Sequence, residues 1–129
     1  MTLTGHSLCG YWAYYALFHN DNIEKNTFTN YYIGSSSMWA NTGGKFMSTY
    51  EDEYYNRTQT LNANVYVTVG ADEDKNFIFS IENFYNDLQD RNYSGLNLTY
   101  EKIEGYDHNT VFKPSIKNTL LMFYKKDSE

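Results

Sequence analysis

The sequence is poor in cysteine, in basic residues and in long apolar runs, and each shortage excludes a class of protein. A single cysteine, Cys9, cannot form an intramolecular disulfide, so no disulfide framework holds this fold. The chain has ten lysines and arginines and sixteen aspartates and glutamates, which gives a net charge of -6. Nucleic-acid binding needs clustered cations, so a nucleic-acid partner is not expected. No apolar run approaches the roughly 18 residues of a membrane span.

Apolar and aromatic side chains are plentiful. They make up 41% and 19% of the chain, and tyrosine alone contributes 14 residues. A composition of this kind supports a packed core rather than disorder. We therefore treat residues 1–129 as one domain, and the composition leaves its cellular compartment open.

Segments with strand and helix patterns alternate along the chain. Short β-branched or aromatic stretches predict strands at 2–4, 28–33, 65–69 and 96–101. Apolar residues at helical spacing predict helices over 8–19, 45–57 and 77–91. This alternation predicts an α/β fold with a mostly parallel sheet of about four strands flanked by helices. The carboxyl ends of such strands share one edge, where ligands and catalytic groups collect.

A fourth helix is expected near the end of the chain. Pro114 suits its first turn, because a fixed φ and a missing N–H are tolerated there. We expect this helix to bury its apolar side chains, namely Ile116, Leu120, Leu121 and Phe123.

Three groups with catalytic chemistry follow three of the predicted strands. They are Ser7, the acidic run 72–74 and His108, in the chain order serine, acid, histidine. A serine hydroxyl needs an imidazole to take its proton, and the imidazole needs a carboxylate to fix its tautomer. The order matches that of α/β-hydrolases. The non-catalytic alternatives are an ordinary strand-to-helix turn at Ser7 and a loop-capping role for His108.

Four motifs carry a resemblance to a known family. The run 5–10, GHSLCG, resembles the G-H-S-x-G-G nucleophile elbow of esterases of the ferric-enterobactin-esterase and esterase D type, in the α/β-hydrolase superfamily. Segment 35–39, SSSMW, is similar to that family's S-P-S-L-W, and 69–73, VGADE, to its glycine-then-carboxylate loop. Segment 104–108, EGYDH, resembles the G-x-D-H that carries the family's histidine. The four motifs occur in family order over essentially the whole chain.

The resemblance implies a serine carboxylic-ester hydrolase that works through an acyl-enzyme. It implies Ser7 as nucleophile, His108 as base, and the backbone N–H of Leu8 as an oxyanion donor. Matching the loop after Val69 gives Glu73 as the acid, with Asp72, Asp74 or no acid at all left open. No metal or cofactor is needed. The ester itself cannot be named from the sequence.

Three residues near these motifs carry further expectations. His6 and Trp39 are expected to contact the substrate, with core packing as the alternative for each. Cys9 replaces a glycine of the family pattern at a tight turn. We expect the substitution to strain the turn by about 1 to 2 kcal/mol.

In the family that the chain resembles, several strands and a second oxyanion loop come before the elbow, and none of them precedes Met1. The resemblance therefore implies the C-terminal half of a partial α/β-hydrolase fold, weakly active and poorly soluble alone. A non-catalytic module is the alternative, which needs a partner chain or self-association at the bare edge of its first strand. Acyl transfer to an alcohol or sugar by the same machinery is a further alternative.

Overall fold

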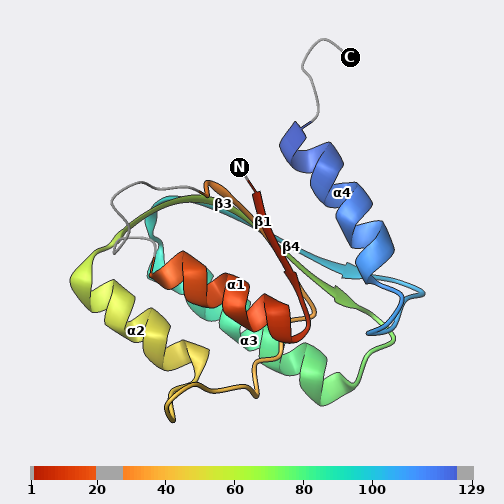
Figure 1. Cartoon of the computed structure of the whole chain (residues 1–129), viewed down its shortest axis with the longest axis horizontal. Coiled ribbons are helices and arrows are strands. Elements are labelled where there is room, and N and C mark those ends of the chain that lie inside the picture. The colour runs from red at the N-terminus through yellow and green to blue at the C-terminus, as the bar shows by residue number, and fades with distance from the viewer. Residues whose placement is uncertain (1, 20–27, 125–129) are drawn as a thin grey trace.

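The computed structural model describes residues 2–19 and 28–124, which form four strands and four helices in alternation (Figure 1). The strands are β1 (Thr2–His6), β2 (Asn30–Gly34), β3 (Thr60–Gly70) and β4 (Ser94–Ile103). The helices are α1 (Leu8–Phe18), α2 (Met47–Arg57), α3 (Lys75–Arg91) and α4 (Phe112–Tyr124). Every element predicted from the sequence is present.

The four strands form one parallel sheet in the order β1-β2-β3-β4. Each consecutive pair of strands is connected through a helix, as parallel strands require. Helices α1, α2 and α3 cover one face of the sheet, and α4 lies on the other (Figure 1). The predicted fold class, a mostly parallel sheet of about four strands flanked by helices, is confirmed.

The main core lies between the sheet and helices α1 to α3. Alternate strand residues such as Ile33, Val65 and Val67 point into it and are fully buried. From the helical side, Leu17 of α1 and Ile81 of α3 meet them. Parallel strands covered on both faces show such dense apolar patterns.

Strand β3 begins five residues before the predicted segment. Leu61 and Ala63 are buried there and alternate with exposed polar residues, which hides the strand in an asparagine-rich stretch. Asn64 accepts a hydrogen bond from the amide of Asn97 at 2.8 Å and donates one to Asn30 at 3.0 Å. These three side chains are in register on β2, β3 and β4, so they form a ladder across the sheet.

The predicted packing of the last helix is wrong. Leu120 and Leu121 are more than half exposed, while the buried side chains of α4 are Ser115 and Thr119. The reason lies in the sheet face beneath, where the Thr68 hydroxyl lies 3.0 Å from that of Ser115. Helix α4 therefore packs on this face with the side that carries the small hydroxyl residues Ser115 and Thr119.

Candidate active site

A tight turn joins β1 to α1 at Ser7. Its backbone has a φ of 62°, a region that residues with a side chain rarely occupy. A Cβ atom at Gly5 would overlap the carbonyl oxygen of Cys9, and one at Gly10 would lie 3.0 Å from Ser36 Cα. Two glycines therefore make room for the turn. The strain expected at Cys9 is not found, because its side chain is exposed and its φ is not positive.

The structure brings Ser7, His108 and Glu73 together at the carboxyl edge of the sheet. His108 Nε2 lies 2.9 Å from Ser7 Oγ, and its Nδ1 lies 2.8 Å from Glu73 Oε1. A carboxylate only accepts, so Nδ1–H donates to Glu73 and Nε2 is free to accept from the serine hydroxyl. The hydroxyl, the imidazole and the carboxylate therefore form one hydrogen-bonded chain.

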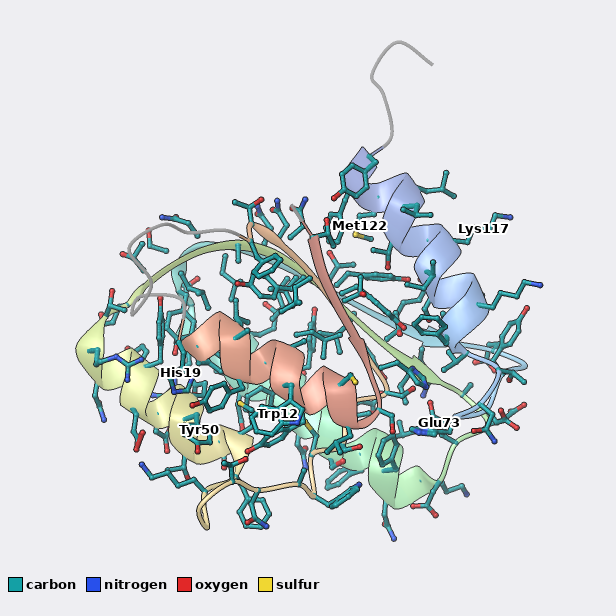
Figure 2. All side chains as sticks on the ribbon, viewed as in Figure 1. Trp12, His19, Tyr50, Glu73, Lys117 and Met122 are labelled. Atoms are coloured by element: carbon teal, nitrogen blue, oxygen red, sulfur yellow. The ribbon has the colours of Figure 1, made fainter. Side chains whose placement is uncertain are left out.

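Glu73 is held firmly in its place beside the sheet (Figure 2). Its side chain is only 1% exposed, and its Oε2 accepts a 2.7 Å bond from the Ser35 hydroxyl and a 2.6 Å bond from the Gly70 N–H. Both oxygens are thus occupied, one by these two donors and the other by His108. A buried carboxylate with this many donors is well satisfied.

The two neighbouring carboxylates do other work. Asp74 is the N-cap of α3, where its side chain accepts from the backbone N–H groups of Asn76 and Phe77. Asp72 is exposed and its backbone N–H bonds the carbonyl of Tyr106. Of the three acids left open by the sequence, only Glu73 reaches the imidazole.

His108 stands in the loop between β4 and α4, which Asp107 organises. The Asp107 carboxylate accepts from the side chain and backbone N–H of Thr110 and from the N–H of Asn109. These bonds, led by that from the Thr110 hydroxyl, lower the pKa of Asp107 below its usual value. Hydrogen bonds within the loop therefore stabilise its conformation, although most of its residues are exposed.

A cavity of about 570 Å³ opens over the serine and the imidazole. Its wall combines the hydrogen-bonded chain with two aromatic rings and further polar groups: Ser7, Ser37, Trp39, Asp72, Glu73, Asp74, Phe77, Asp107, His108 and Asn109. Trp39 is 68% exposed there, so its ring is available to a bound molecule. Phe77 packs edge-on against His108 with ring centroids 5.4 Å apart.

Leu8 and His6 flank the serine in different ways. Leu8 is the first residue of α1, and its backbone N–H, like the others of a first turn, lacks a partner within the helix. His6 is absent from the cavity wall, and its Nε2 instead lies 2.9 Å from the backbone oxygen of His108.

Sequence reasoning overlooked Ser35 and Phe77. Ser35 comes just after a predicted strand, at the edge where the site was expected, and this position was its available signal. Phe77 begins the predicted helix that follows the acidic run 72–74, and its place after that run was its available signal.

Within residues 2–19 and 28–124, no three histidine, cysteine, aspartate or glutamate side chains are arranged to hold a metal ion. No helix in these same ranges is long and apolar enough to cross a bilayer.

Comparison with solved structures supports the resemblance drawn from the motifs. The chain is similar to the BES protein of Bacillus cereus, with 29% identity over 92% of this chain and a TM-score of 0.75. It is similar in fold to an IroE-like serine hydrolase of Shewanella oneidensis, at 16% identity over 96% of the chain and a TM-score of 0.76. The siderophore hydrolase EstA of Aspergillus nidulans matches at 19% identity over 94%, with a TM-score of 0.73.

The predicted resemblance is confirmed in that the structural neighbours of the chain include an IroE-like serine hydrolase, siderophore hydrolases and an enterobactin esterase. The match covers 43%, 40% and 46% of the three proteins compared, so the chain spans less than half the length of each. No family model and no curated protein sequence matches the chain.

Proposed function

We propose that this chain carries the catalytic residues of a serine carboxylic-ester hydrolase. Ser7 is the nucleophile, His108 the general base and Glu73 the acid that orients the base. Support comes first from the two hydrogen bonds that link the three side chains, and second from neighbours that include hydrolases of siderophores. The positive φ of Ser7 is the strained geometry of a nucleophile elbow, which lifts the hydroxyl above the sheet edge.

The first half of the reaction forms an acyl-enzyme. His108 Nε2 takes the proton of the Ser7 hydroxyl as the oxygen attacks the ester carbonyl, and the same proton then passes to the leaving alcohol. Glu73 stabilises the imidazolium that forms in between, without itself becoming protonated. In the second half, His108 Nε2 takes a proton from a water molecule as the water oxygen attacks the acyl carbonyl. The bond between Ser7 Oγ and the acyl group then breaks, and His108 returns the proton to Oγ as the acid leaves.

The negative charge on the carbonyl oxygen needs donors that are already in place. The Leu8 N–H is one, because it follows the nucleophile and opens α1, where the helix dipole also favours an anion. In other enzymes one such donor contributes about 10² to 10³ in rate. Trp39 and Phe77 provide apolar surface on the cavity wall, so the acyl or alcohol group would pack against them.

A fluorophosphonate probe tests this proposal directly, because it reacts only with an activated serine. We expect the probe to label Ser7, which peptide mass spectrometry identifies. Ser7→Ala should remain unlabelled, and Ser37→Ala, which removes another hydroxyl of the cavity wall, should be labelled at the wild-type rate. Hydrolysis of p-nitrophenyl acetate should follow the same pattern. Equal labelling of Ser7→Ala and the wild type would contradict the proposal.

A second candidate function follows from two surfaces without a partner. Strand β1 pairs only with β2, which leaves its other edge open within the described residues. Large apolar side chains of α4, including Leu120, Leu121 and Met122, are also exposed. Both features favour a module that completes its sheet with a partner chain or a second copy. Such a module would associate in size-exclusion chromatography and leave the probe unreacted, whereas the esterase is labelled.

A further inference from the structure

His6 connects the two segments that carry Ser7 and His108. It is the last residue of β1 and the chain neighbour of Ser7, and its Nε2 lies 2.9 Å from the backbone oxygen of His108. Its ring lies against the His108 ring, with centroids 5.1 Å apart, and meets Phe112 at 5.3 Å. One side chain of β1 thus contacts the loop after β4 and the first residue of α4.

The partners of the His6 ring determine its protonation. A carbonyl oxygen only accepts, so Nε2 carries the proton and donates to His108. Nδ1 is buried and has no hydrogen-bond partner among the described residues, so a proton there would have no acceptor. Burial also lowers the pKa of His6 below its usual value. The neutral Nε2–H form is therefore the one that fits.

The sheet leaves space for the His6 ring at one neighbouring position. Gly34 is paired in register with His6 on β2, and a Cβ atom there would lie 3.3 Å from His6 Nδ1. Such an atom would also overlap the Tyr32 hydroxyl. A side chain at position 34 would therefore clash with Tyr32 and press against the His6 ring, which the glycine avoids.

We infer that His6 is a positioning residue, which holds the backbone of His108 at the height of the Ser7 hydroxyl. The inference rests on the proposed function. Glu73 sets the rotation of the His108 ring through Nδ1, and the His6 bond sets the place from which that ring projects. Both bonds are needed because the loop around His108 is largely exposed. A displacement of about 1 Å in such a pair can cost about 10² in rate.

Two variants and one control separate positioning from general stability. His6→Phe keeps a planar ring beside Phe112 but removes the donor, and His6→Gln restores an N–H at similar reach. Leu61→Ala is the control, because Leu61 is buried at the amino end of β3, away from the site. The readouts are kcat and KM for p-nitrophenyl acetate, at a temperature where circular dichroism shows each protein folded.

We expect His6→Phe to lower kcat about 10- to 100-fold with KM nearly unchanged. His6→Gln should recover most of the loss, and Leu61→Ala should keep the wild-type kcat. In the wild type, nitrogen-15 chemical shifts should show His6 as the Nε2–H tautomer, a result that does not depend on any variant folding.

The inference is overturned by an Nδ1–H tautomer at His6, by a wild-type kcat in folded His6→Phe, or by equal losses in His6→Gln and His6→Phe. Failure of the proposed function looks different. In that case the wild type itself is not labelled at Ser7 by the fluorophosphonate probe, whatever the tautomer of His6.

Discussion

Replacing Glu73 with glutamine would reverse its hydrogen bond to His108 while changing little else. Ser35 and the Gly70 N–H both donate to Oε2, so the amide oxygen of the variant would remain there to accept them. The amide NH₂ group then faces His108 Nδ1, where Oε1 lies in the wild type. An NH₂ group only donates, so Nδ1 must become the acceptor and Nε2 must carry the proton. In that tautomer His108 cannot accept the proton of Ser7.

We expect Glu73→Gln to lower kcat by about 10³- to 10⁴-fold, the range in which a wrong histidine tautomer acts. That corresponds to about 4 to 5.5 kcal/mol of transition-state stabilisation. The assay is hydrolysis of p-nitrophenyl acetate together with the rate of fluorophosphonate labelling. Asp72→Asn is the matched control, because Asp72 is adjacent and exposed, and it should stay close to wild type. A folded Glu73→Gln variant with activity similar to that of Asp72→Asn would refute the reasoning.

Three further predictions concern stability, each measured by urea denaturation. Tyr14→Phe should raise the free energy of unfolding by about 1 kcal/mol, because the buried Tyr14 hydroxyl has no partner among the described residues; a clear loss would show that the hydroxyl is bonded. Arg91→Met should lower it by about 3 kcal/mol, since Arg91 binds both oxygens of Glu51, whose side chain is 4% exposed. A change under about 1 kcal/mol would mean that the pair contributes no more than an exposed one. Burial raises the pKa of Tyr31 to about 12 from its usual 10.0. The contribution of the protonated Tyr31 to the free energy of unfolding is therefore complete below about pH 10 and declines as the pH rises towards 12. The urea midpoint should therefore fall between about pH 10 and pH 12, and a constant midpoint would count against this burial effect.

Most of the fold could be predicted because its elements have strong local patterns. The run 65–69 is continuous and β-branched, and α3 has a clear apolar face, so neither depends on distant residues for its assignment. The start of β3 was missed because its exposed positions hold asparagines, whose bonds to Asn30 and Asn97 exist only across strands. The orientation of α4 was missed because it depends on the Thr68 hydroxyl of another strand.

The candidate site divides in the same way. Ser7 and His108 follow from motifs that are local in sequence, and the parallel sheet brings such loops to one edge. The match of the loop after Val69 pointed to Glu73, but local sequence left Asp72 and Asp74 open because the three acids are adjacent. The choice depends on the direction of each side chain after Gly70, which Ser35 and the cap of α3 determine.

The amino-acid order by itself determined the alternation of strands and helices and the three positions where a hydroxyl, a carboxylate and an imidazole would occur. Periodicity and turn residues act over a few neighbours, so they can be read along the chain. Only the tertiary structure decided which acid faces His108. It also decided that His6 contacts the loop that carries His108 rather than the cavity. Glu73 and His108 are 35 positions apart in the sequence, and His6 and His108 are 102 positions apart. The geometry of both contacts therefore exists only once the sheet has assembled.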